Sequence, residues 1–154
     1  MLSPQQALVR LQNLCSRGEK CIFDVRKKLI TWDINPNDSE SIINDLLAGK
    51  YIDEERYATA FVRDKSRFAH WGAIKIRAAL KAKNISDSII QTALKELEKL
   101  NYDDVLEDML RKKIKSIKAA NQNDLKAKLI RFGMSRGFEY DLIYSLVSKI
   151  ITDG

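Results

Sequence analysis

The 154-residue sequence contains few of the residues that interrupt helices or carry out chemistry. Only two prolines and six glycines occur, which favours helices and argues against an all-β architecture. Two cysteines and one histidine are too few for a structural zinc site, so we expect no metal and no cofactor. Glycine-rich phosphate loops, nucleophile elbows and carboxylate clusters are missing too, so we expect no catalytic residues and no enzyme activity.

Long apolar segments are missing as well. No run approaches the roughly 18–20 apolar residues that span a bilayer, and the first residues lack the basic start and apolar core of a signal peptide. We therefore expect a cytoplasmic protein with no membrane contact. In a reducing compartment Cys15 and Cys21 would remain free thiols.

One short pattern occurs three times, about fifty residues apart. A leucine is followed four residues later by Asp, Asn or Gly and then by a large apolar residue, in 29–34, 80–85 and 129–134. Asp, Asn and Gly tolerate the left-handed backbone region in which many helices end, and such an end folds the next apolar residue back onto the helix. We therefore predict equivalent helix ends at Asp33, Asn84 and Gly133. The alternative is an ordinary nine-helix bundle whose helix ends coincide by chance.

Apolar residues recur with helical period throughout the chain, and alternating strand patterns are absent. A capping box at 3–6 begins the first helix, and Asp53 is a good N-cap for the fourth. Ser86 should cap a helix that continues through Leu100. We predict an all-α fold of three tandem three-helix repeats, elongated and curved, with repeats at 1–50, 51–101 and 102–154.

Positive charge is concentrated in one segment, 63–83, in a chain of net charge +6. Its bases, accompanied by the single acid Asp64, are Arg63, Lys65, Arg67, Lys75, Arg77, Lys81 and Lys83. Such a cluster is suited to bind phosphates or an acidic protein surface. The seven positive side chains repel one another, and a negatively charged partner would offset that repulsion. The equivalent helices of the other two repeats are also basic, with Arg26, Lys27 and Lys28 in one and Lys126, Lys128 and Arg131 in the other. The alternative is that each basic side chain only keeps a helix face in contact with solvent.

The aromatic residues admit two interpretations. Trp71, beside Gly72, could stack on a nucleobase or fill a gap between helices in the core, and we favour the second role. Trp32, Phe68 and Phe132 are expected to be packing residues, and His70 to be a helix-terminal residue.

The second repeat resembles the RecX family. Its segments YIDEERYA (51–58) and WGAIKIRAALKAKNI (71–85) match that family's acidic helix start, D-x-x-R-[FY]-A, and its basic helix, G-x-x-x-I-R-x-x-L-x-x-[KR]-G-[IV]. The first repeat resembles the family's opening segment, and the third matches by pattern. Asp33 and Asn84 stand where the family usually has glycine, which a left-handed helix end tolerates.

This resemblance implies a regulator of the RecA recombinase. RecX proteins consist of tandem three-helix repeats, lie in the groove of the RecA–DNA filament, and generally depress ATP hydrolysis and strand exchange. The resemblance thus implies a role in homologous recombination, DNA repair and the SOS response, with the RecA filament and single- or double-stranded DNA as partners of a monomer.

The residues expected to contact RecA or DNA are Arg26, Lys27, Arg63, Arg67, Lys75, Arg77, Lys81, Lys83, Lys126 and Lys128. Two alternatives stay open. One is a helical nucleic-acid-binding protein that acts without RecA, and the other is a scaffold that uses the basic stripe for acidic proteins.

Overall fold

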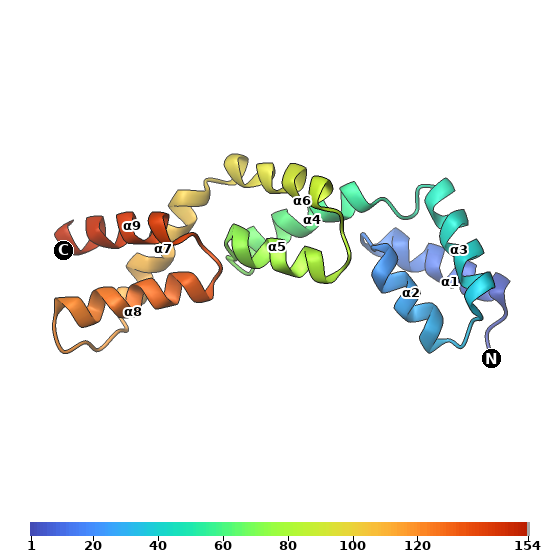
Figure 1. Ribbon diagram of the computed structural model, residues 1–154, viewed down its shortest axis with the longest axis horizontal. Coiled ribbons are helices and arrows are strands. Elements are labelled where there is room, and N and C mark those ends of the chain that lie inside the picture. The colour runs from blue at the N-terminus through green and yellow to red at the C-terminus, as the bar shows by residue number, and fades with distance from the viewer. Residues whose placement is uncertain (154) are drawn as a thin grey trace. The chain divides into compact units, whose positions relative to one another are not determined.

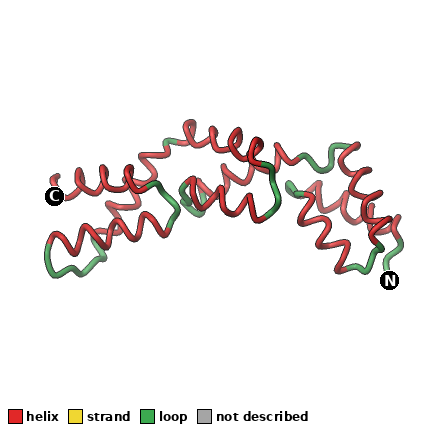
Figure 2. The backbone as a smooth tube through the Cα atoms, viewed as in Figure 1, coloured by secondary structure: helices red, strands yellow, loops and turns green. Residues whose placement is uncertain are grey.

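The computed structural model describes residues 1–153, which form nine α-helices and one 3-10 helix and contain no strand (Figures 1 and 2). The all-α class is therefore confirmed. The helices form three consecutive groups. The first is α1 (Pro4–Arg17), α2 (Ile22–Thr31) and α3 (Pro36–Ala48); the second is α4 (Glu54–Arg67), α5 (Ala73–Ala82), α6 (Asp87–Leu94) and the 3-10 helix η1 (Lys95–Leu100); the third is α7 (Tyr102–Ile114), α8 (Gln122–Ser135) and α9 (Tyr140–Asp153).

The chain divides into two compact units. The first unit contains residues 1–60 and 80–93, and the second contains residues 61–79 and 94–154. The middle group of helices therefore contributes to both units. The beginning of α4 and all but the last residue of α6 belong to the first unit, whereas the end of α4 and most of α5 belong to the second.

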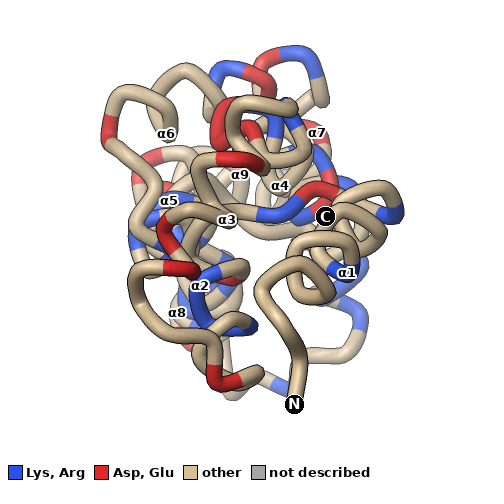
Figure 3. The backbone as a smooth tube through the Cα atoms, turned by 90° about the vertical axis from the view of Figure 1, so that its right-hand side faces the viewer, with Lys and Arg blue, Asp and Glu red and all other residues tan. Residues whose placement is uncertain are grey.

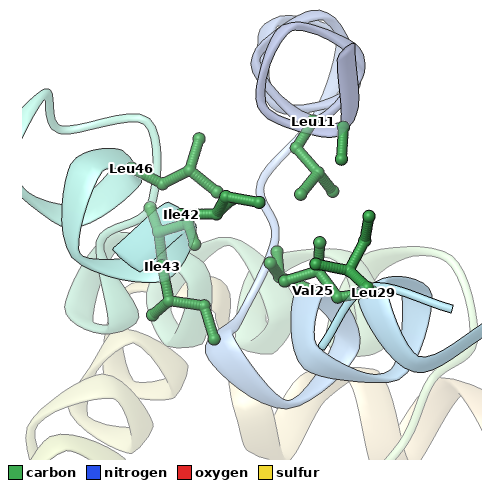
Figure 4. Packing of buried hydrophobic residues seen from close by; sticks show 9 residues of the cluster. Leu11, Val25, Leu29, Ile42, Ile43 and Leu46 are labelled. Atoms are coloured by element: carbon green, nitrogen blue, oxygen red, sulfur yellow. The ribbon is translucent and has the colours of Figure 1, made fainter. Parts of the chain in front are cut away.

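The core of the first unit lies among α1, α2 and α3. Figure 4 shows side chains from these three helices pointing toward one another, and they are almost fully buried. They are Leu11 from α1, Val25 and Leu29 from α2, and Ile42, Ile43 and Leu46 from α3. Burying one such side chain stabilises the fold by roughly 1.5–3 kcal/mol, so this apolar contact holds the group together.

The core of the second unit is formed mainly by α7, α8 and α9, which pack on one another. Its buried members are Leu106, Leu110, Leu129, Phe138, Ile143, Leu146, Val147 and Ile150. Gly133 of α8 is also buried, and a Cβ placed on it would lie 2.9 Å from the side chain of Ile143. Glycine at this position therefore allows α8 and α9 to approach closely.

The expected N-terminal caps are present. Ser3 and Gln6 form a complete capping box at the start of α1. The Asp53 carboxylate accepts a hydrogen bond of 3.0 Å from the Arg56 N–H, and the Ser86 hydroxyl accepts one of 3.4 Å from the Ile89 N–H. Each bond pairs an amide that the first turn of a helix leaves without a backbone partner.

Two of the three predicted helix ends are confirmed. Asp33 and Asn84 both have a left-handed backbone with φ of 59°. After them the Ile34 N–H donates to the carbonyl of Leu29 at 3.0 Å, and the Ile85 N–H donates to the carbonyl of Leu80 at 3.2 Å. Ile34 and Ile85 are consequently folded back and buried.

The third predicted helix end, at Gly133, is wrong. α8 continues through Gly133 to Ser135, and the left-handed residue is Gly137, with φ of 89°. The Phe138 N–H donates to the carbonyl of Gly133 at 3.2 Å, and Phe138 is buried whereas Met134 is exposed. Because Ile143 needs the space at Gly133, glycine here serves helix packing and not a turn.

The helix predicted from Ser86 through Leu100 also differs. Its α-helical part, α6, ends at Leu94, and the chain continues as the 3-10 helix η1. Asn101 then adopts a left-handed conformation with φ of 54° and begins α7.

Candidate functional site

The basic segment contributes its first basic residues from the end of α4, in the second unit. Figure 3 marks the Lys and Arg positions along the chain in blue. The guanidinium of Arg63 contacts the carboxylate of Glu96 at 3.2 Å. Arg67 is exposed and forms no ion pair with any residue in 1–153. Phe68 is 80% exposed, so its expected packing role is wrong. The end of α4 therefore presents an unpaired cation next to an exposed aromatic residue.

Trp71 lies in the link between α4 and α5, where two lysines contact its ring. The ammonium of Lys65 lies 4.6 Å from a ring centroid of the indole, and that of Lys75 lies 4.7 Å from it. Phe61 meets the indole edge-on at 6.4 Å. Trp71 is partly buried and contacts side chains of both α4 and α5, so it lies between these helices, as favoured, without being fully enclosed. Cation–π attraction of about 0.5–1 kcal/mol per pair holds the two ammonium groups near one aromatic ring.

The start of α5 is fixed by hydrogen bonds that it donates to backbone carbonyls of the third helical group. The Gly72 N–H donates to the carbonyl of Arg136 at 2.6 Å, and the Ile74 N–H donates to that of Gly137 at 2.9 Å. A Cβ on Gly72 would overlap the backbone of Gly137, so this approach requires glycine. The contact orients the first turn of α5, which carries Lys75.

Tyr102 completes this arrangement. Its hydroxyl accepts a hydrogen bond of 2.8 Å from the Ala73 N–H and donates one of 2.5 Å to the carboxylate of Glu139. Burial raises the pKa of Tyr102, and the hydrogen bond to Glu139 raises it further. The phenol therefore remains protonated, as its hydrogen bond to the Glu139 carboxylate requires.

Arg77 lies in acidic surroundings. It lines a hollow together with four acidic residues, Glu98, Asp103, Asp104 and Glu139. Its guanidinium forms no ion pair within 4.0 Å in the described chain, and its side chain is exposed. The local field at Arg77 is therefore less positive than its place in the basic segment suggests.

A second hollow nearby is basic. It is lined by Ser66, Arg67, His70, Lys99, Leu100, Asn101 and Val105. His70, expected to be a helix-terminal residue, follows α4 with a left-handed φ of 54°. Lys99 was missed by the sequence analysis because it lies outside 63–83. Only the course of η1 brings it to Arg67, and no local pattern signals that contact.

The candidate bases of the first unit mostly form ion pairs within the chain. Lys81 contacts Asp87 at 3.3 Å, Lys83 contacts Asp24 at 2.6 Å and Arg26 contacts Glu40 at 2.6 Å. The hydrogen bond from Lys83 to Asp24 raises the pKa of Lys83. Lys27 is exposed, forms no ion pair with a described residue, and lines a hollow whose apolar wall includes Trp32.

Trp32 and Phe132 are partly buried and pack against the first and second cores respectively, as expected. The α8 bases have partners of their own. The ammonium of Lys126 lies 4.4 Å from the Tyr144 ring, and that of Lys128 lies 3.1 Å from Asp124. Most of the predicted site residues therefore already contact another side chain of this chain.

A charged contact fixes the start of α2 in the first unit. The Ile22 N–H donates to Glu54 Oε1 at 3.4 Å, and Arg56 contacts Glu19 at 2.6 Å. The second oxygen of Glu54 is buried without a hydrogen-bond partner among the described residues, and burial raises the pKa of this carboxyl. Burial also raises the pKa of the Cys21 thiol, to about 11, so this cysteine remains protonated and unreactive at neutral pH.

Residues 1–153 contain neither a candidate metal site nor a candidate membrane-spanning helix. No group of three or more His, Cys, Asp or Glu side chains is placed to hold a metal ion. No helix there has the length and apolar character needed to cross a membrane.

Two family models match the chain. "RecX, second three-helix domain" matches residues 53–94, and "RecX, third three-helix domain" matches residues 101–147. "Regulatory protein RecX" of Vibrio parahaemolyticus is 32% identical over 142 residues, which cover 92% of this chain and 88% of that protein. The chain belongs to the RecX family. The Vibrio campbellii protein of the same name is 33% identical over the same shares of the two chains.

Solved RecX structures have the same fold. The crystal structure of RecX from Lactobacillus salivarius matches with a TM-score of 0.82 at 22% identity, over 97% of each chain. Another, a crystal structure of regulatory protein RecX, matches with a TM-score of 0.85 over 95% of this chain and 73% of that one. The tandem three-helix architecture predicted from the sequence is therefore confirmed as the RecX architecture.

Proposed function

We propose that this RecX-family protein regulates the RecA recombinase by binding in the groove of the RecA–DNA filament and lowering ATP hydrolysis and strand exchange. The observation that carries the proposal is the match to regulatory RecX proteins over 92% of the chain. Cationic side chains on all three helical groups support it, because a filament groove bordered by nucleic-acid phosphate attracts positive charge. Its cellular roles would be homologous recombination, DNA repair and the SOS response.

The proposed contacts remain the ten basic residues named from the sequence. Arg67, Lys75 and Lys27 are foremost because they form no ion pair with a described residue and, unlike Arg77, do not line the acidic hollow. Arg26 and Lys81 are engaged in exposed ion pairs. Exposed pairs contribute only about 0–1 kcal/mol, so phosphates or partner carboxylates can replace the intrachain acids at little cost.

Repeats provide a route to inhibition. We propose repeat borders at 1–50, 51–101 and 102–154, with separate repeats gripping neighbouring RecA subunits. A second contact made by the same chain acts at a high effective concentration, so the pair of contacts binds far more tightly than either alone. Bridged subunits would resist the movements that accompany ATP hydrolysis.

The direct test measures DNA-dependent ATP hydrolysis by RecA with and without this protein. The proposal expects a lower rate at amounts well below one molecule per RecA subunit, because one bridge restrains several subunits. An unchanged rate combined with tight binding to bare DNA would favour the alternative, a nucleic-acid-binding protein that acts without RecA.

A pair of charge-reversal variants locates the contact surface. Arg67→Glu with Lys75→Glu should abolish the effect on RecA, while urea denaturation shows a loss no larger than the roughly 0.5–1 kcal/mol of the Lys75–Trp71 contact. The matched control is Arg17→Glu with Lys95→Glu, which changes the net charge equally at two exposed positions outside the proposed contacts. If the control loses the effect equally, only overall charge matters and the proposed surface is wrong.

A further inference from the structure

The basic hollow beside the end of α4 has the features of an anion site. Its wall comes from the end of α4, the α4–α5 link, the end of η1 and the start of α7. Arg67 and Lys99 supply positive charge, and no carboxylate is among its lining residues. Arg67 forms no ion pair in the described chain, and Lys99 has only a loose one, 3.7 Å from Glu96, with its side chain 75% exposed. Both cations are therefore available to a ligand.

The hollow also has hydrogen-bond donors without partners. Ser66 is 2% exposed, yet its hydroxyl forms no hydrogen bond with any residue in 1–153. A polar side chain without a partner is uncommon in so buried a residue, and its position in the wall leaves it available to whatever fills the hollow. The imidazole of His70 adds further donor capacity at the same wall.

Two left-handed residues set the course of the backbone around the hollow. His70 and Asn101, each with φ of 54°, both line it, and Asn101 ends η1 as Asp33 and Asn84 end other helices. Asn101 begins α7 but forms no side-chain cap, so the positive end of this 13-residue helix lacks a capping oxygen. The first-turn acids of α7, Asp103 and Asp104, line the neighbouring acidic hollow and not this one.

We propose that this hollow binds one phosphate group of a nucleic-acid backbone. Arg67 and Lys99 neutralise its charge, and Ser66, His70 and the start of α7 donate hydrogen bonds. Donors converging from several elements fit a tetrahedral phosphate, and the planar guanidinium of Arg67 offers it two parallel bonds. The inference deepens the proposed function by assigning a ligand to one part of its surface, and nucleic acid as the source of the phosphate rests on that function.

Titration with two probes, in the absence of RecA, tests the proposal. Inorganic phosphate and an oligo-dT single strand are added separately to the 15N-labelled full chain, and amide and arginine side-chain NMR signals are followed. Both probes should shift the Arg67 Nε–H and the backbone amides of His70 and Asn101. Shifts with phosphate alone would overturn nucleic acid as the source, and oligo-dT binding that leaves these signals unmoved would overturn the site.

Variants sharpen the result. Arg67→Gln with Lys99→Gln should weaken oligo-dT binding about tenfold or more and reduce the slope of log K against log salt by about 0.7, since the hollow contacts one phosphate and each lost phosphate contact removes about 0.7. Lys95→Gln, on the same 3-10 helix but outside the hollow, is the matched control for Lys99. Arg67→Lys keeps the charge but not the paired bonds, so intermediate affinity is expected.

Failure here is distinguishable from failure of the proposed function. If the double variant binds oligo-dT normally but the RecA assay still shows inhibition, the hollow is not a phosphate site and the regulatory proposal survives. If the hollow binds oligo-dT as expected while RecA is unaffected, the site stands and the RecA proposal fails. Amide spectra of each variant verify that it is folded.

Discussion

The second helix of the first group and the second helix of the middle group both begin against residues of the helical group that follows, yet the two junctions differ in chemistry. At α2 the junction is charged, with Glu54 accepting from the Ile22 N–H and Arg56 contacting Glu19. At α5 the junction consists of backbone hydrogen bonds from Gly72 and Ile74, with the Tyr102 hydroxyl beside them.

The comparison shows that one position in a repeat can be held by different forces. The stability of the charged junction is expected to depend on pH and salt, because its contacts are made by carboxylate and guanidinium groups. The α5 junction is expected to respond to side-chain volume, because Gly72 and Gly137 meet backbone to backbone. Four substitutions test this contrast, in decreasing order of expected effect.

Gly72→Ala should have the largest effect, a loss of about 1–3 kcal/mol or more in the free energy of unfolding. The new Cβ would overlap the Gly137 carbonyl, and backbone on that side leaves little room to move. Urea denaturation measures the loss. Gly18→Ala is the control, since a Cβ there meets nothing within 4 Å and its φ of 174° suits any residue. Equal effects of the two changes would refute the close-approach argument.

Tyr102→Phe should cost about 1 kcal/mol or somewhat more in unfolding free energy. The change keeps the ring, which lies 5.0 Å from that of Phe138, but removes the acceptor of the Ala73 N–H and the donor to Glu139. Hydrogen exchange of the Ala73 amide measured by NMR should accelerate. Tyr51→Phe, at an exposed tyrosine, is the control, and an unchanged Ala73 exchange rate in Tyr102→Phe would contradict the assigned bond.

Glu54→Gln should change the pH dependence of stability, by up to about 1 kcal/mol in unfolding free energy. Because burial raises the pKa of Glu54 in the folded state, the folded protein holds this proton more tightly than the unfolded chain does. The contribution of Glu54 to stability is thus full at acid pH and falls as pH rises through the raised pKa. Urea denaturation at pH 4 and pH 7 should show the Glu54→Gln variant gaining stability relative to the parent at pH 7, and a difference independent of pH would contradict this.

Arg56→Gln should have the smallest effect. The guanidinium is exposed, so its contact with Glu19 at 2.6 Å is screened by solvent, although it also donates to the Lys50 carbonyl at 3.0 Å. Thermal unfolding at low and high salt measures the loss of stability. The difference in unfolding temperature between Arg56→Gln and the parent protein should shrink as the salt concentration rises. A difference that salt leaves unchanged would assign the effect to the carbonyl contact.

Local sequence predicted most helix boundaries because caps and helix ends depend on adjacent residues. Ser3, Asp53 and Ser86 each cap a helix through their own side chain, and Asp33 and Asn84 each end one through their own φ. None of these features needs a distant partner. A few consecutive residues were therefore enough to predict them.

The wrong or missed predictions concern residues whose roles depend on contacts and surroundings that the adjacent sequence does not reveal. Gly133 resembles a helix end, but its role is set by Ile143, ten positions further along the chain. Phe68 matches the period of a buried face, yet it lies at the last, exposed end of that face. Lys99 and Arg67 are far apart in sequence, so only the folded chain shows that they line one hollow.

The sequence by itself determined the helical class, the three-part repetition, the RecX family and the excess of positive charge. These depend on composition and on short-range periodicity, which act within a helix or a turn. The tertiary structure alone decided which bases are neutralised by acids from elsewhere in the chain, which glycine ends α8, and where a basic hollow forms beside an acidic one. Those outcomes depend on distances between residues that are remote in the chain, and Coulomb and packing forces act through space and not along the backbone.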